Sequence, residues 1–235
     1  MDFLKPFVLP VEARTPERHE TLDIYPPDDI AGPRPAILFV PGGPTPAQVR
    51  PEQRDWPVYR GYGALAASRG AVGAVVDHQL HTPLAYAVGA ARVEAALESL
   101  RSDERVDEGR LALWFFSGGS LLAADWLREP PSWLRVLALS YPLLAPMPGW
   151  RVEGRFDPIG AAARAVALPI VLTRAGREDV GVAGTVEAFV AEAGKAELEI
   201  VDVPEGHHAF DVVDDSEESR GAVNRAMDLV LAKLA

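Results

Sequence analysis

The sequence predicts an α/β fold in which a mostly parallel central sheet is flanked by helices. Short, wholly apolar runs recur along the chain, and longer stretches with helical periodicity separate them. At 235 residues, of which 48% are hydrophobic, the chain can bury one large core. We therefore expect a single domain over residues 1–235, with a small cap or none, the candidate cap being a short lid loop over residues 141–165.

The first half of the chain contains four expected strands and one clear helix. The strands cover residues 18–25, 36–40, 71–76 and 111–116. The first strand alternates in polarity, which favours a place near the edge, whereas the others are apolar and belong in the interior. Between the last two strands, Ala, Val and Leu recur at helical spacing over residues 84–100, so this segment is expected to be a crossover helix.

The second half repeats the pattern of strands and helices. The expected strands cover residues 136–140, 169–173 and 197–203. The alternation of the last one places it nearer an edge of the sheet. Helices are expected over residues 181–193 and from about 217 to 234, which completes the alternation of strands and helices.

Two segments lack clear periodicity, namely residues 45–63 and 141–156. Both are rich in proline and aromatic residues, and we expect them to be long loops, which in a compact domain often shape a binding site. The candidates for an apolar pocket wall are Trp56, Tyr59, Phe116, Met147 and Trp150. A cap of this size favours a compact substrate over a long-chain lipid.

Composition excludes several classes of protein. The chain has no cysteine, which removes disulfides, thiolate metal sites and cysteine nucleophiles. A net charge of −11 argues against a nucleic-acid partner, because such partners draw affinity from clustered Lys and Arg. No apolar stretch reaches the roughly 18 residues of a membrane span, and the N-terminus does not resemble a signal peptide. We expect a cytoplasmic protein without a membrane partner.

The feature most indicative of chemistry is Ser117, which lies where the apolar run 111–116 gives way to a helix-like segment. A serine at a sharp strand-to-helix turn is a candidate nucleophile, because the turn exposes its hydroxyl beside free backbone N–H groups. A helix N-cap is the alternative role for Ser117. Ser120 is the alternative nucleophile, although it falls inside the expected first helical turn.

Four segments that follow expected strands together resemble the α/β-hydrolase superfamily. They are Gly42-Gly43, Ser117-Gly118-Gly119, Arg177-Glu178-Asp179 and Gly206-His207-His208-Ala209-Phe210. The chain is most similar to the dienelactone-hydrolase-like and small esterase branch, over nearly its whole length. The resemblance implies an α/β-hydrolase fold and a catalytic triad in the order serine, acid, histidine.

The resemblance assigns the triad to Ser117, Asp179 and His208. A hydroxyl becomes nucleophilic when an imidazole takes its proton, and a carboxylate fixes the imidazole tautomer. Glu178 competes with Asp179 for the acid, and His207 competes with His208. In the family motif a small residue and an aromatic follow the histidine, which fits His208. Asp211 is interpreted as a helix-start charge.

The oxyanion hole is expected to use backbone N–H groups of Gly118 and of Gly42 or Gly43. Two departures from the family pattern concern this region. Phe115 stands where the family has glycine two residues before the serine, and Pro44, which has no N–H, stands in the glycine-rich loop. A plain Pro-Gly turn is the alternative interpretation of the loop.

The sequence therefore predicts a serine hydrolase that cleaves small carboxylic esters through an acyl-enzyme intermediate, with a small-molecule ester as its partner and no cofactor. An acyl-peptide or amide hydrolase is the enzymatic alternative, and a non-catalytic binding protein with a decayed site is the alternative from another class. His78 and His81 lack a third ligand at convincing spacing, so no metal site is expected. A homodimer is left open.

Overall fold

The computed structural model describes residues 2–29 and 31–235, and it contains one eight-stranded sheet. The strands are β1 (Glu17–Arg18), β2 (Leu22–Tyr25), β3 (Arg34–Val40), β4 (Val72–Val76), β5 (Val106–Phe116), β6 (Leu134–Ser140), β7 (Ile170–Ala175) and β8 (Leu198–Val203). Their order is β1-β2-β4-β3-β5-β6-β7-β8. β1 and β2 pair antiparallel with their neighbours, and the other strands are parallel. This arrangement confirms the predicted α/β class.

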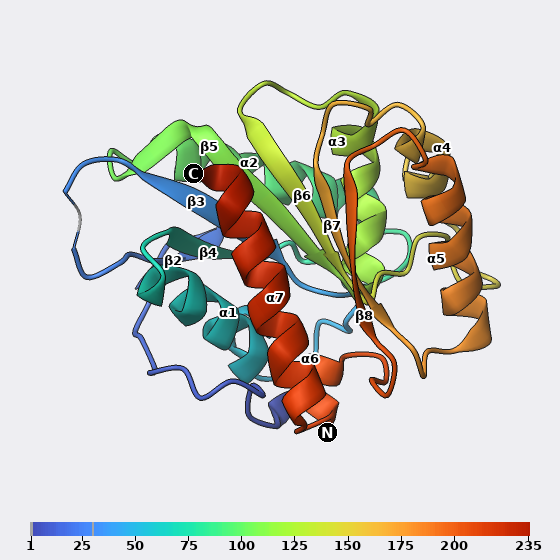
Figure 1. Ribbon diagram of the computed structural model, residues 1–235, viewed down its shortest axis with the longest axis horizontal. Helices are drawn as coiled ribbons and strands as arrows, with labels where there is room; N and C mark the ends of the chain where they lie inside the picture. The colour runs from blue at the N-terminus through green and yellow to red at the C-terminus, as the bar shows by residue number, and fades with distance from the viewer. Residues whose placement is uncertain (1, 30) are drawn as a thin grey trace.

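Helices cover both faces of the sheet (Figure 1). The α-helices are α1 (Pro57–Ser68), α2 (Tyr86–Arg101), α3 (Ala124–Arg128), α4 (Pro158–Ala162), α5 (Val180–Glu192), α6 (Phe210–Val213) and α7 (Glu217–Leu234). The 3-10 helices are η1 (Asp2–Leu4), η2 (Gln53–Asp55) and η3 (Ser117–Ala123). α1 and α7 lie on one face, and α2 to α5 lie on the other. None of the helices in the described part of the chain is both long and apolar enough to cross a membrane.

The sheet is buried on both faces, and the strands divide their side chains between two cores. In β3, Leu38 belongs to the core under α2 and α5, whereas Phe39 belongs to the core under α1 and α7. Phe115 and Phe116 of β5 divide in the same way. This alternation is the period of two that an extended chain imposes, and it explains why the buried runs of β3 and β5 are apolar at successive positions.

The structure corrects the prediction of a loop over residues 45–63, because α1 begins at Pro57 inside that segment. The sequence did not indicate this helix, because Gly61 and Gly63 are poor helix formers. Both glycines are required by packing. A Cβ on Gly61 would collide with the ring of Phe7, and one on Gly63 would lie 2.5 Å from Cδ2 of Tyr25. The second expected loop, residues 141–156, is irregular as predicted.

The parallel topology gathers the segments that carry polar chemistry. β3, β5 and β7 run in one direction, and β8 runs parallel to β7, so their carboxyl ends meet at one edge of the sheet. Gly42, Ser117, Glu178 and His208 follow these four ends by no more than five residues. Ligands of open α/β sheets bind at this edge, which makes it the place to look for a site.

Candidate active site

Ser117 occupies a strained turn between β5 and η3. Its φ is +46°, in the left-handed region that residues with a Cβ seldom adopt. The turn is compact because a Cβ on Gly118 would collide with the carbonyl oxygen of Gly43, and one on Gly119 would collide with that of Pro41. The backbone N–H of Leu143 donates to the carbonyl of Ser117 at 3.0 Å. The Ser117 hydroxyl is therefore held at a tightly packed strand-to-helix bend.

Ser117 lies at the end of a chain of two short side-chain contacts. Its Oγ is 2.7 Å from Nε2 of His208, and Nδ1 of His208 is 2.6 Å from Oε2 of Glu178. A carboxylate only accepts hydrogen bonds, so Nδ1 carries the proton and Nε2 is free to accept from the serine hydroxyl. The Glu178 side chain is 6% exposed, whereas that of His208 is 38% exposed. The carboxylate is thus shielded behind an imidazole that faces the site.

The structure places Glu178 against His208, where the sequence analysis expected Asp179. Asp179 is the N-cap of α5, and its carboxylate accepts from the backbone N–H of Gly181 at 2.8 Å. A capping side chain turns back onto its own helix and cannot reach outward at the same time. The second carboxylate oxygen of Glu178 accepts from the N–H of Asp179 at 2.8 Å. The cap therefore also fixes the orientation of its neighbour.

His207 and Ser120, the competing candidates for the base and the nucleophile, lie away from this arrangement. His207 is turned to Asp214, which accepts from its backbone N–H at 2.7 Å and lies 3.0 Å from its Nδ1. Ser120 is fully buried in η3, and its hydroxyl contacts no polar partner among the described residues. Ser117 and His208 are the pair that the structure brings together.

The N–H groups of the three expected oxyanion donors differ in whether they already have an acceptor. The N–H of Gly42 donates to the Tyr59 hydroxyl at 2.9 Å, so it is not available to an oxyanion. Gly118 lies in the first turn of η3, where backbone N–H groups have no intrahelical partner. The N–H of Gly43 donates to no acceptor within residues 2–29 and 31–235. Gly43 and Gly118 are the two donors left available beside Ser117.

His78 holds the loop that carries Gly43, a role that the sequence analysis missed. Its Nδ1 accepts from the N–H of Leu80 at 2.9 Å, and its Nε2 lies 3.0 Å from the carbonyl oxygen of Pro41, to which it therefore donates. Burial lowers the pKa of His78 to about 4, so the ring is neutral at pH 7. His81, the other histidine considered above as a metal ligand, contacts the carbonyl oxygen of Thr45 through its Nδ1 at 3.0 Å.

A buried carboxylate lies behind His208. Asp211 is fully buried and accepts hydrogen bonds of 2.9 Å from the hydroxyls of Tyr62 and Tyr141. Burial raises the pKa of Asp211 to about 6. The ring of Tyr141 packs edge-on against His208, with centroids 5.1 Å apart. Asp211 lies in the first turn of α6, in keeping with the expected helix-start charge, and its carboxyl group links two core tyrosines beneath the site. The sequence feature that could have indicated this burial is a single charged residue, Asp211, within the otherwise apolar run 209–213.

Ser117 and His208 open into a pocket of about 290 Å³. Of the five expected wall residues, Trp56 and Tyr59 line it. Phe116 lies beneath Tyr59 in the core, with ring centroids 5.4 Å apart. The remaining two, Met147 and Trp150, do not line the pocket. Met147 is exposed, and Trp150 packs against the core on the other face of the sheet. Phe115 is buried in that same core and fills no part of the pocket.

Comparison with solved structures gives matches over nearly the whole chain. An esterase from the planctomycete Thermogutta terrifontis superimposes with a TM-score of 0.69 at 19% identity, covering 97% of this chain and 94% of that one. The esterase rPPE matches with a TM-score of 0.75 at 15% identity, covering 97% and 84%. A putative dipeptidyl aminopeptidase IV from Bacteroides ovatus matches at 0.69 and 15% identity, covering 88% of this chain and 33% of that one.

These matches show the α/β-hydrolase fold, which confirms the fold that the sequence resemblance implies. The likeness to the dienelactone-hydrolase-like branch stays a prediction. No protein-family model matches the chain, and no curated protein matches it in sequence. At identities of 15–19% the similarity shows architecture, and the chemistry has to be argued from the site itself.

Proposed function

We propose that this protein is a serine hydrolase that cleaves small carboxylic esters through an acyl-enzyme intermediate. The observation that carries the proposal is the pair of contacts that joins Ser117 to His208 and His208 to Glu178, at 2.7 and 2.6 Å. This is the geometry in which an imidazole can take the proton of a hydroxyl while a carboxylate stabilises the resulting charge. The proposal assigns the acid to Glu178 and gives Asp179 a structural role.

In the first half of the reaction, Ser117 Oγ attacks the ester carbonyl carbon while its proton passes to Nε2 of His208. The carbonyl oxygen becomes an oxyanion, which we assign to the N–H groups of Gly43 and Gly118. Collapse of the tetrahedral intermediate breaks the bond to the alcohol, which leaves with the proton from His208. In the second half, water loses a proton to His208 and attacks the acyl carbon. The bond from the acyl carbon to Ser117 Oγ then breaks, Oγ takes the proton back from His208, and the carboxylic acid is released.

The size and lining of the pocket support a small substrate. A volume of about 290 Å³ beside apolar walls suits a short acyl group and a small alcohol. Structures of the Thermogutta terrifontis esterase 2 with bound propionate and with phosphorylation by paraoxon support the same substrate class. Propionate is the size of acyl product that this pocket would release.

The test is steady-state hydrolysis of p-nitrophenyl acetate, propionate and butyrate by the wild type, Ser117→Ala and Ser120→Ala. We expect the wild type and Ser120→Ala to be active, because Ser120 makes no polar contact that the reaction uses. Ser117→Ala should lose activity by at least about a thousandfold. The p-nitroanilides of the same acids test the amide alternative. A folded wild type that hydrolyses no ester would overturn the proposal.

A further inference from the structure

The segment 3–14, here called the N-terminal strap, crosses the same face of the molecule as α1. It is fixed at two adjacent positions. The ring of Phe7 packs against Tyr62 with centroids 4.9 Å apart, in a space that Gly61 leaves open. The next residue, Val8, donates its backbone N–H to the carbonyl of Asp211 at 3.1 Å. The strap is therefore attached to α1 and to α6, the short helix that begins two residues after His208.

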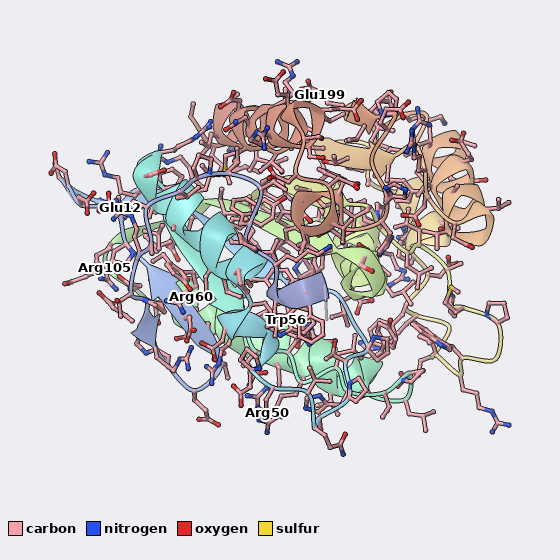
Figure 2. The ribbon with its side chains drawn as sticks, turned by 90° about the horizontal axis from the view of Figure 1, so that it is seen from below. Glu12, Arg50, Trp56, Arg60, Arg105 and Glu199 are labelled. Carbon is pink, nitrogen blue, oxygen red and sulfur yellow. The ribbon has the colours of Figure 1, made fainter. Side chains whose placement is uncertain are left out.

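The start of the strap reaches the candidate active site. Phe3, in η1, stacks on Trp56 with ring centroids 4.2 Å apart and an interplanar angle of 17°. Figure 2 shows Trp56 beside this short helix. Phe3 and Trp56 both line the pocket that contains Ser117 and His208. Phe3 thus contributes a wall to a pocket whose reacting groups lie more than 110 residues later in the chain.

A second, larger space lies under the strap. A groove of about 1010 Å³ is lined by strap residues and α1, and Val212 and Val213 line both this groove and the active-site pocket. The two spaces are therefore neighbours with a shared wall. The groove lining mixes apolar residues, such as Phe7 and Val8, with charged ones, such as Arg60 and Asp215. Phe3 and Trp56 line the active-site pocket and not the groove, so the ring of Phe3 bounds the pocket itself.

We infer that Phe3 determines acyl-chain specificity by limiting, with its ring, the length of the active-site pocket that it lines. With Phe3 in place, the pocket accepts short acyl groups. Removal of its ring lengthens the pocket and admits medium-length chains. The inference rests on the proposed function and deepens it, since it names the acyl side of the ester as the part that the strap selects.

The experiment compares kcat/KM for p-nitrophenyl octanoate and p-nitrophenyl acetate in the wild type, Phe3→Ala and Leu4→Ala. Phe3→Ala should raise the octanoate-to-acetate ratio by at least about tenfold, mainly through KM for octanoate. Leu4 is the matched control, because it belongs to the same helix, is exposed and lines neither space. Leu4→Ala should keep the wild-type ratio. Thermal melts verify that both variants are folded.

The outcomes separate the two proposals. An unchanged ratio in a folded Phe3→Ala that still cleaves acetate would overturn the inference and leave the esterase assignment intact. An equal rise in Leu4→Ala would also overturn it, because loosening of the strap in general, and not the Phe3 ring, would then set specificity. A folded wild type that cleaves neither ester would overturn both proposals together.

Discussion

Glu178 and Asp179 are adjacent in sequence, yet their carboxylates serve different structures. Asp179 turns back to cap α5, and Glu178 extends to His208. The sequence alone could not separate them, because both follow a strand and both are acids. The capping preference of aspartate is the physical reason for the outcome, since a short side chain at the first position before a helix satisfies free backbone N–H groups.

This division of roles predicts opposite consequences of substitution. Glu178→Gln should lower kcat by about a thousandfold or more, because the amide cannot stabilise the charged His208 or enforce its tautomer. Asp179→Ala should keep kcat near wild type and lower the free energy of unfolding by about 1 kcal/mol through loss of the cap. Asp179→Asn, which can still cap, is the control. Ester kinetics and urea denaturation provide the measurements, and a reversed pattern would reinstate Asp179 as the acid.

Gly118 offers a second test at the residue scale. A methyl group there would collide with the carbonyl oxygen of Gly43, so Gly118→Ala must displace one of the two proposed oxyanion donors. We expect kcat to fall by about a hundredfold or more, as it does on loss of one such donor in other hydrolases. Gly184→Ala in α5, where a Cβ meets open space, should leave kcat unchanged. Equal activity of the two variants would remove Gly43 and Gly118 from the oxyanion hole.

At the scale of elements, hydrophobic patterning predicted the strands better than the helices. The apolar runs 36–40 and 111–116 form the ends of β3 and β5, because a strand buried on both faces has to be apolar at every position. α1 was missed because its glycines and aromatic residues are chosen for packing and not for helix propensity. The tertiary contacts of Gly61 and Gly63 overrode a weak local preference.

The packing of α1 is testable through Gly63. Alanine is the better helix former by about 0.5–1 kcal/mol, so propensity alone predicts that Gly63→Ala stabilises the protein. The structure predicts the reverse, a loss of about 1–3 kcal/mol, because the new methyl group would lie 2.5 Å from the ring of Tyr25. Gly221→Ala in α7 meets open space and should be stabilising. The midpoints of urea denaturation distinguish the two expectations. A Gly63→Ala variant more stable than the wild type would contradict the close packing of Gly63 against Tyr25.

At the scale of the whole molecule, two buried ionisable groups have opposite effects on how the free energy of unfolding changes with pH. Burial raises the pKa of Asp211 from 3.8 to about 6, so between these values the folded protein keeps a proton that the unfolded chain releases. The contribution of Asp211 to stability therefore falls as pH rises. The pKa of His78 is lowered from 6.5 to about 4, so in this range the unfolded chain binds the extra proton. The contribution of His78 rises with pH.

These opposed effects predict that Asp211→Asn steepens the pH dependence of stability. With the Asp211 contribution removed, the free energy of unfolding should rise more strongly from pH 4 to pH 6.5 than in the wild type, by up to about 3 kcal/mol at roughly 1.4 kcal/mol per pKa unit. The amide oxygen can still accept from Tyr62 and Tyr141, which preserves the core. Urea denaturation at several pH values tests this, and parallel curves for the two proteins would contradict it.

The candidate site as a whole was only partly accessible to sequence reasoning. Ser117, His208 and the glycine loop could be located because parallel topology brings strand ends together. Phe3, His78 and Asp211 could not, because their places depend on contacts between segments that are distant in sequence. The strap is the clearest case, since an apolar N-terminal residue carries no local signal that it will stack on Trp56 beside the site.

The central claim is that Ser117 is a nucleophile activated by His208 and Glu178. Its most direct test is intact-protein mass spectrometry after treatment with a fluorophosphonate, which reacts with activated serines, using the wild type, Ser117→Ala and Ser120→Ala. The account predicts a single adduct on the wild type and on Ser120→Ala, and none on Ser117→Ala. A folded wild type without an adduct, or an adduct that persists on Ser117→Ala, would contradict it.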